Sequence, residues 1–399
     1  MIGVNENREE LVFYSQGNTD TKRRSMMQQS LFRKALFPGK YIQGAGALTE
    51  LPSLIRLFGG NGVVVASGSS CRRILPESGL DLDASSISVE PFHGECCETE
   101  LSRIAEIISS RAARVVVAMG GGKAIDTAKI AADREGLPVI VVPTIASTDA
   151  PCSGCAVIYS DRGVFESVAY QKLNPAAVLV DTAVIAKAPA RFLVSGMGDA
   201  LSTWFEARSC ERTGSANECG GTGTMAGLCL ARLCFDTLLA YGRTARVAVE
   251  SKVVTPALER IVEANTLLSG IGFESGGLAS AHAIHNGFTA LEETHSSYHG
   301  EKVAFGVLAG LHLTDADPAE LNQVYDFCEE VGLPTTLVSL GIDVKERSRL
   351  RLVAEKACDP GSSIRKEPGS ITPEKVLDAL LAADAVGTGR ISNPQPAKH

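Results

Sequence analysis

The chain has 399 residues, of which 45% are hydrophobic and 21% are charged, and its net charge is −8. This length predicts two domains around a large core, and the composition is that of an ordinary globular protein. The acidic balance without a basic stripe argues against nucleic acid as a partner, and no run approaches the roughly 18 apolar residues that a membrane span requires.

Residues 1–30 are polar and show no periodic pattern. They lack the apolar core of a signal peptide, and their acidic residues are unfavourable in a transit peptide. We therefore expect a flexible extension on a cytoplasmic protein. The eleven cysteines are expected to be reduced thiols. Cys152 and Cys155 have the spacing of a redox or zinc motif, but no matching second pair accompanies them.

Strand and helix patterns alternate between residues 31 and 188. Short apolar runs predict buried strands, and the i, i+3, i+4 spacing over 98–110 predicts an amphipathic helix. This alternation predicts an α/β domain with a mostly parallel sheet and covering helices. The expected strands are 40–44, 62–66, 87–92, 114–119, 138–142 and 177–180, with a second helix at 123–132 and a hairpin of 156–159 with 164–168.

Only helical periodicity is found from residue 189 onward. The second half is therefore predicted to be an all-helical domain over 189–399, with the boundary near residues 187–189 and a frayed end over 390–399. The expected helices are 189–209, 223–240, 252–270, 278–291, 302–313, 318–331, 344–357 and 373–383.

Three consecutive glycines, Gly120, Gly121 and Gly122, stand between a predicted strand and a predicted helix, and Lys123 and Asp126 follow. Without Cβ atoms the backbone can close on a phosphate, and the first N–H groups of the helix can bind it. The motif is neither G-x-G-x-x-G nor a Walker A sequence, and a tight turn is the alternative. Because ligands bind at the carboxyl edge of such sheets, we favour a dinucleotide site.

The next strand leads into a polar loop, Pro143-Thr-Ile-Ala-Ser-Thr-Asp149-Ala-Pro151, at the same edge of the sheet. Thr144 and Ser147 can hydrogen-bond a phosphate or a ribose, and Asp149 can bind a substrate hydroxyl. Roles in turn formation are equally compatible with these residue types.

Four of the seven histidines fall between Glu274 and Glu301. His282 and His285 lie three residues apart on a predicted helix and so project from one face. His299 precedes the next predicted helix, and two helices that present imidazole to one point commonly bind a transition metal. A role as an ordinary core or surface residue is the alternative for each histidine.

Asp199 follows Ser195-Gly-Met-Gly near the start of the helical half. Taken by itself, it is typical of the N-terminal cap of a helix. Its carboxylate would also complete a ligand set with two histidines and leave the open coordination positions that a catalytic metal requires.

Together these segments resemble the glycerol dehydrogenases of the iron-containing alcohol dehydrogenase superfamily, from about Phe37 to the C-terminus. The resemblance implies a Rossmann-like domain followed by a helical domain, with the active site in the cleft between them. The matching segments are Pro38–Gly44, Gly120–Asp126, Pro143–Asp149, Gly196–Ala200 and Glu274–Gly277, continuing through His282 to His299–Lys302.

The resemblance implies an NAD-linked dehydrogenase that reversibly oxidises glycerol to dihydroxyacetone, with Zn²⁺ held by Asp199, His282 and His299. On this basis Asp149 is expected to orient the substrate, and His285, beside the metal, to relay the proton. The dinucleotide is expected to contact Gly121, Gly122, Lys123, Asp126, Thr144, Ser147, Ser153, Cys155 and Tyr159.

Two positions depart from the family pattern. The iron enzymes of the superfamily carry a further histidine one turn after the ligand aspartate, where this chain has Thr203, and this favours zinc over iron. The aspartate that binds the adenosine ribose is replaced by Ser67, with Arg72 and Arg73 nearby. An acidic group at that point favours NAD and repels a 2′-phosphate. NAD remains the expected cofactor.

The resemblance also implies a homo-oligomer, up to an octamer of stacked rings. Another small diol or a hydroxy acid is an alternative substrate. A dehydroquinate-synthase-like lyase is a further alternative, but it needs basic residues where the predicted metal helix carries Ser280, Asn286 and Thr289. The glycine junction argues against a metal-dependent hydrolase without a nucleotide, and the Asp/His/His set argues against a nucleotide-binding protein that has lost catalysis.

Overall fold

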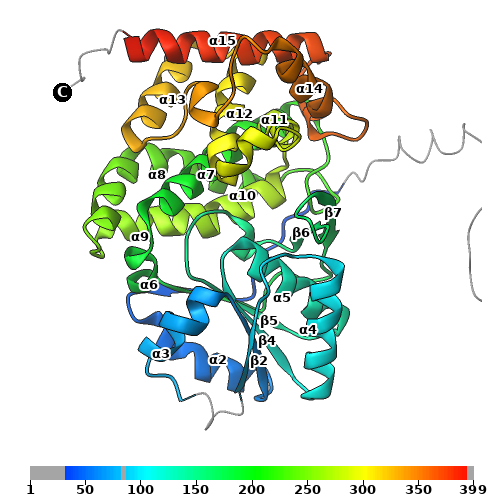
Figure 1. Ribbon diagram of the computed structural model, residues 1–399, viewed down its shortest axis with the longest axis vertical. Coiled ribbons are helices and arrows are strands. Elements are labelled where there is room, and N and C mark those ends of the chain that lie inside the picture. Colours follow the sequence, from blue (N-terminus) through cyan, green and yellow to red (C-terminus); the bar gives the residue numbers. More distant parts are fainter. Residues whose placement is uncertain (1–31, 82–86, 393–399) are drawn as a thin grey trace, which may run out of the picture.

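The computed structural model of the chain describes residues 32–81 and 87–392. A sheet with its covering helices forms one part and a stack of helices forms the other, and Figure 1 shows the sheet below the helices. The predicted fold class, α/β followed by all-helical, is confirmed. The extension predicted over residues 1–30 lies outside the described residues.

Within the described residues, six parallel strands form the main sheet in the order β1-β8-β5-β4-β2-β3, and β6 pairs with β7 as a separate antiparallel hairpin. The chain runs outward from β2 to β3 and then returns to the other side of β2 with β4, so the winding direction reverses between β2 and β4. The strands are β1 (Tyr41–Gly44), β2 (Gly62–Ala66), β3 (Ile87–Pro91), β4 (Val115–Gly120), β5 (Val139–Pro143), β6 (Cys155–Tyr159), β7 (Phe165–Tyr170) and β8 (Ala177–Asp181).

The central strands consist of consecutive β-branched residues. The residues of β2 and β4 are all buried, because helices cover both faces of the sheet. Leu101, Ile104 and Ile108 are buried on one side of α4, whose limits are the predicted ones. The helices of this part are η1 (Ala47–Glu50), α2 (Leu51–Leu57), η2 (Ser70–Ile74), α3 (Leu75–Glu77), α4 (Glu98–Ser110), α5 (Gly122–Arg134), η4 (Ala150–Cys152) and α6 (Thr182–Lys187).

Helices make up the rest of the described chain. Asp317 caps α13 through the amides of Ala319 and Glu320, and Gly332 ends it in the left-handed conformation, so its limits are also the predicted ones. The helices are α7 (Ala190–Thr213), α8 (Met225–Glu250), α9 (Pro256–Glu263), η5 (Ala264–Leu268), α10 (Ser269–Gly276), α11 (Ser280–Phe288), η6 (Glu292–Ser296), α12 (His299–Leu313), α13 (Pro318–Val331), η7 (Val338–Leu340), α14 (Arg347–Ala357), η8 (Ser363–Lys366) and α15 (Pro373–Ser392).

Several expectations about this part change. The last helix continues to Ser392 rather than ending at residue 383, so residues 390–392 are helical and not frayed. The helix expected over 223–240 continues to Glu250 as α8, and the one expected over 252–270 begins at Pro256 and continues to Gly276. One helix, α8, is long and apolar enough by length and composition alone to cross a membrane, although no such stretch is expected from the sequence. It packs against α7, α9 and α10, and the Cys234 thiol on its buried side contacts the carbonyl groups of Ala200 and Ala264. One side of α8, which includes Cys234, Phe235 and Leu238, therefore contributes to the core of the helical part, whereas apolar residues on its other side are exposed.

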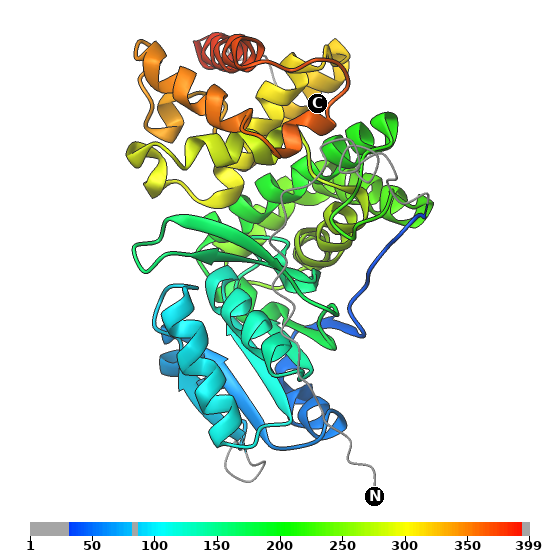
Figure 2. The same ribbon diagram turned by 90° about the vertical axis from the view of Figure 1, so that its right-hand side faces the viewer.

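The hairpin of β6 and β7 lies between the sheet and the helices, as Figure 2 shows from the side. Tyr170 at the end of β7 donates to Glu218 of the helical part at 2.8 Å. On the other side of the molecule, Gln43 of β1 donates to Glu259 of α9 at 2.8 Å. Hydrogen bonds therefore join the sheet part to the helical part at two separate places. The domain boundary near residues 187–189 stays a prediction.

Candidate active site

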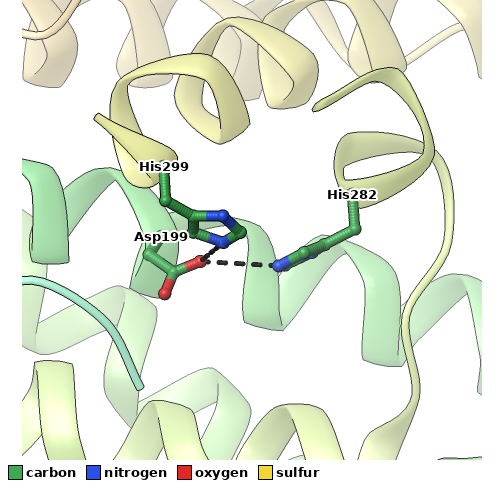
Figure 3. Close-up of side chains that lie close together, drawn as sticks. All are labelled: Asp199, His282 and His299. Carbon is green, nitrogen blue, oxygen red and sulfur yellow. Dashed lines mark hydrogen bonds and ion pairs between the residues drawn. The ribbon is translucent and has the colours of Figure 1, made fainter. Parts of the chain in front are cut away.

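Three of the predicted ligand side chains converge from three helices. Asp199 lies in the middle of α7, whereas His282 and His299 lie in the first turns of α11 and α12 (Figure 3). Oδ1 of Asp199 lies 3.1 Å from His299 Nε2 and 3.4 Å from His282 Nε2. The ligand atoms of the three residues all lie within 4.8 Å of one another. The alternative in which Asp199 caps the N-terminus of a helix is wrong, because α7 begins at Ala190, within one residue of the helix expected over 189–209.

Glycines bring the helices close enough for these side chains to meet. A Cβ atom at Gly198 would lie 2.3 Å from the carbonyl oxygen of Gly300, and one at Gly300 would lie 1.7 Å from that of Ser195. The backbones of α7 and α12 are therefore in direct contact beside both Asp199 and His299. This contact, which only glycine permits, sets the distance between the two ligands.

Glu206, two turns after Asp199 on α7, fixes the orientation of the His282 ring. Its Oε2 lies 2.6 Å from His282 Nδ1, and its Oε1 accepts the backbone N–H groups of Ala279 and His282. Because Nδ1 donates to this carboxylate, the lone pair on Nε2 is directed toward Asp199 and His299. Such a carboxylate–histidine pair is the usual support for a metal ligand.

The charges of the cluster favour a cation. Burial opposes ionisation of Asp199, but His299 and His282 outweigh burial and hold the pKa of this carboxyl well below its ordinary value. Burial also opposes protonation of His282, but Glu206 and Asp199 raise the pKa of this ring well above its ordinary value. The two acids thus stabilise positive charge at this point, which a divalent metal ion can supply in place of protons.

His285 lies beside the cluster without belonging to the three-residue ligand set. Its ring centroid is 4.2 Å from that of His299, and its Nδ1 lies 3.1 Å from Asn286 Oδ1. Burial, together with the neighbouring His299 and Lys302, holds the pKa of His285 well below its ordinary value. The ring is therefore neutral.

The glycine triplet lies at the carboxyl edge of the sheet, where the winding reverses. β4 ends at Gly120, and α5 begins at Gly122. A Cβ atom would lie 2.9 Å from the Ser67 side chain if added at Gly120 and 2.9 Å from the Ile145 side chain if added at Gly121. These short distances explain why Gly120 and Gly121 carry no side chain. Sheets of this kind bind their ligands at the point where the winding reverses.

The loop after β5 joins this edge to the ligand cluster. The N–H of Asp149 donates to Asp199 Oδ2 at 3.2 Å. The carboxylate of Asp149 accepts a hydrogen bond from Ser269 at 2.8 Å. Burial, and then the negative charge of Asp199, raise the pKa of Asp149 well above its ordinary value. The Thr203 hydroxyl contacts Ser269 Oγ at 2.8 Å, so position 203 supports Asp149 instead of adding a fourth ligand.

The predicted dinucleotide contacts fall into two groups. Gly121, Gly122, Thr144 and Ser147 lie at the ends of β4 and β5. The other five lie on or beneath the hairpin of β6 and β7, and these are Lys123, Asp126, Ser153, Cys155 and Tyr159.

Most of this second group is engaged within the protein. The buried Asp126 accepts the N–H of Val157 at 3.1 Å, and Lys123 forms an ion pair of 2.6 Å with Glu95. The hydroxyl of Ser153 lies 3.4 Å from Nζ of a buried lysine, Lys129. These side chains hold the hairpin against α5, and a direct contact with a dinucleotide stays a prediction for them.

Two buried charged residues that sequence analysis does not identify hold the loop after Asp149. Lys129 is 1% exposed, and its Nζ donates to the carbonyl groups of Ala150 at 3.0 Å and Cys155 at 2.5 Å. Glu274 of α10 accepts the N–H of Gly154 at 2.7 Å. Buried ionisable side chains are tolerated when they are hydrogen-bonded, and here all three hydrogen bonds hold the same loop. Single charged residues within helices give no sequence signal for this role.

Comparison with known proteins agrees with this geometry. The family described as iron-containing alcohol dehydrogenase matches residues 38–182. The glycerol dehydrogenase of Thermotoga maritima is 52% identical over 356 residues, which cover 89% of this chain and 98% of that protein. The glycolaldehyde reductase of Halobacterium salinarum is 45% identical over 357 residues, which cover 88% of this chain and 96% of that protein.

A solved structure of a similar protein supports the same family. The probable glycerol dehydrogenase from Sinorhizobium meliloti 1021 matches with a TM-score of 0.85 and 45% identity, over 90% of this chain and 99% of that one. Sequence identity of this size extends over nearly the full length of the relatives and includes both the sheet and the helical part. The chain therefore belongs to the glycerol dehydrogenase family of the iron-containing alcohol dehydrogenases and is an oxidoreductase.

Proposed function

We propose that the chain catalyses the reversible, NAD-linked oxidation of glycerol to dihydroxyacetone at a zinc centre held by Asp199, His282 and His299. One observation carries the proposal: the amide of Asp149, in the loop that leaves the nucleotide edge of the sheet, donates to Asp199 at 3.2 Å. A dinucleotide at the glycine triplet and a small alcohol at the ligand cluster would therefore be neighbours. Hydride transfer requires that proximity.

The donor set fits a divalent transition metal. Two imidazole nitrogens and one carboxylate oxygen suit zinc, and three protein ligands leave coordination positions for a substrate. Zinc is proposed over iron because position 203 offers a hydroxyl, already bonded to Ser269, where a fourth imidazole would be needed. When bound, the ion supplies a Lewis acid that lowers the pKa of a substrate hydroxyl.

The chain's own residues position the substrate and accept its proton. The Asp149 carboxyl group, held by Ser269 at 2.8 Å, can hydrogen-bond a second hydroxyl group of a polyol. Asn286 engages only Nδ1 of the His285 ring, so Nε2 is available to accept the proton released on oxidation. The N–H groups around Gly121 and Gly122 suit the dinucleotide phosphates.

Removal of metal is expected to abolish activity, and zinc is expected to restore it. The measurement is NAD reduction with glycerol before chelation, after chelation, and after addition of Zn²⁺ or Fe²⁺, with the metal content determined at each step. We expect one zinc per chain in the active protein. Unchanged turnover in the metal-free protein would contradict the mechanism, and restoration by Fe²⁺ alone would replace zinc with iron.

Glu206→Gln is expected to weaken zinc binding by about 10- to 100-fold, as loss of a supporting hydrogen bond typically does. Glutamine keeps an oxygen for the amides of Ala279 and His282 but can present an N–H group to His282 Nδ1. The ring then favours the tautomer with the proton on Nε2, which cannot bind the metal. Titration with a competing chelator measures the affinity. Glu211→Gln, an exposed residue of the same helix, is the matched control, and equal affinities in the two variants would refute the orienting role.

A small hydroxyaldehyde is the second candidate substrate. The relative named glycolaldehyde reductase is 45% identical to this chain, and reduction of an aldehyde is the same reaction in reverse. The kcat/KM values for dihydroxyacetone and glycolaldehyde, measured with the reduced cofactor, decide between the two. The family assignment leaves the lyase and hydrolase alternatives without support.

A cytoplasmic location and a homo-oligomeric state are further parts of the proposal. All eleven cysteines lie within the described residues and are free thiols, as expected in a reducing compartment. Light scattering on the purified protein measures the number of associated chains, for which an octamer is the expectation.

A further inference from the structure

The site for the adenosine ribose is expected next to the glycine triplet, at the end of β2. The N–H of Ser67 donates to the carbonyl oxygen of Met119 at 2.9 Å, which ties the end of β2 to β4. A Cβ atom at Gly120 would lie 2.9 Å from Ser67 Cβ. Ser67 follows β2 and the glycine triplet follows β4, so the two lie on either side of the point where the winding reverses. Dinucleotides bind to such sheets at this point.

The side chain at this point is neutral. The Ser67 hydroxyl lies 2.8 Å from Ser70 Oγ and 3.1 Å from Ser69 Oγ. An Asp or Glu beside the ribose of a dinucleotide accepts hydrogen bonds from the ribose and repels a 2′-phosphate. In this chain β2 is followed at once by neutral residues, Ser67 to Ser70, and no carboxylate stands among them. A cluster of hydroxyl groups accepts either a ribose hydroxyl or a phosphate, because each hydroxyl can both donate and accept.

A guanidinium group lies over the same turn. A Cβ atom at Gly68 would lie 3.1 Å from Nη1 and 3.5 Å from Nη2 of Arg72, so the guanidinium covers the residue that follows Ser67. Arg72 is exposed and forms no hydrogen bond or ion pair with another residue of 32–81 or 87–392. Its planar fork of donors is therefore available to an anion, and guanidinium pairs with phosphate through two parallel hydrogen bonds.

We propose that the ribose site of this chain binds the 2′-phosphate of NADP as well as the free hydroxyl of NAD. The Arg72 guanidinium and the hydroxyls of Ser67 and Ser69 are the groups that take the phosphate. The inference rests on the proposed dinucleotide-linked function and extends it, because a site without a carboxylate loses its means of rejecting NADP.

Direct binding tests the inference without turnover. The fluorescence of NADH and NADPH, titrated with the purified full chain, gives a dissociation constant for each. We expect the two constants to differ by less than about tenfold, since no carboxylate opposes the phosphate. Competition by 2′,5′-ADP and by 5′-AMP, which differ in the 2′-phosphate, is expected to show the same near-equality.

Variants separate the contributions. Ser67→Asp is expected to shift the binding ratio toward NADH by about a hundredfold, because two like charges are brought together. Arg72→Ala is expected to shift it in the same direction by about tenfold, the size of a typical charge-assisted hydrogen bond. Arg73→Ala is the matched control and is expected to leave the ratio unchanged, because Arg73 lines a separate cavity with Gly46, Asp181 and Lys187.

The outcomes distinguish this inference from the proposed function. A wild-type preference for NADH of about tenfold or more, or an Arg72→Ala variant that weakens both cofactors equally, overturns the inference. Glycerol oxidation with NAD in that protein would leave the proposed function intact. Binding of both cofactors without oxidation of glycerol supports the inference and removes the proposed substrate.

Discussion

Asp199→Asn is expected to lower kcat for glycerol oxidation by about a thousandfold or more, the factor that corresponds to about 4 kcal/mol of lost Lewis-acid stabilisation. Asparagine has the size of aspartate and can still accept the N–H of Asp149, so the loop contact is preserved. It lacks the negative charge that both His282 and His299 face. The variant is therefore expected to fold normally and to hold far less zinc.

Steady-state kinetics and elemental analysis of the purified variant check this expectation. Asp236→Asn is the matched control, because Asp236 is an exposed residue of α8 that pairs with Arg232 on the surface. Circular dichroism and the melting temperature establish that each variant is folded. A folded Asp199→Asn protein with a full complement of zinc and wild-type turnover would show that the metal binds elsewhere.

Local patterns in the sequence predict most of the fold. The valine runs of β2 and β4 are buried on both faces, and such runs occur in parallel sheets covered by helices. The limits of α4 are predicted correctly, because its apolar residues follow the helical period and most of its polar residues, Glu100 excepted, lie on the other side of the helix. The sequence also singles out His282 and His299 as candidate ligands, and the structure brings them together with Asp199, while their binding of a metal stays a prediction.

Features that depend on long-range packing are not visible in local patterns. The helix predicted over 189–209 runs through the glycines before Asp199, but no local pattern explains them there, since glycine weakens a helix interior. In the structure they lie within α7, where a Cβ atom at Gly196 would lie 2.0 Å from the carbonyl oxygen of Ala146. Glu206 follows Asp199 by two turns of the same predicted helix, but its role depends on a contact with His282, which is 76 residues away in the chain. The direction of Asp126, toward the hairpin, depends on strands far away in the chain.

The contact between α7 and α12 is the feature on which the site depends most directly. The helices meet backbone to backbone, so no side chain can move to relieve an added atom. A Cβ atom at Gly300 would lie 1.7 Å from the carbonyl oxygen of Ser195 and 2.8 Å from the amide nitrogen of Asp199. Relief therefore requires that one helix shift, and a shift would move His299 away from Asp199.

Gly300→Ala is expected to destabilise the protein by more than about 3 kcal/mol, above the usual cost of an overpacked core, because the clash is with backbone. The intrinsic preference of a helix for alanine, about 1 kcal/mol, is too small to compensate. Thermal unfolding and zinc titration measure both effects. Gly389→Ala in α15 is the control, because nothing lies within 4 Å of a Cβ atom there. It is expected to be neutral or slightly stabilising. An equally stable Gly300→Ala protein with normal zinc affinity would mean that the close contact of α7 and α12 does not set the ligand geometry.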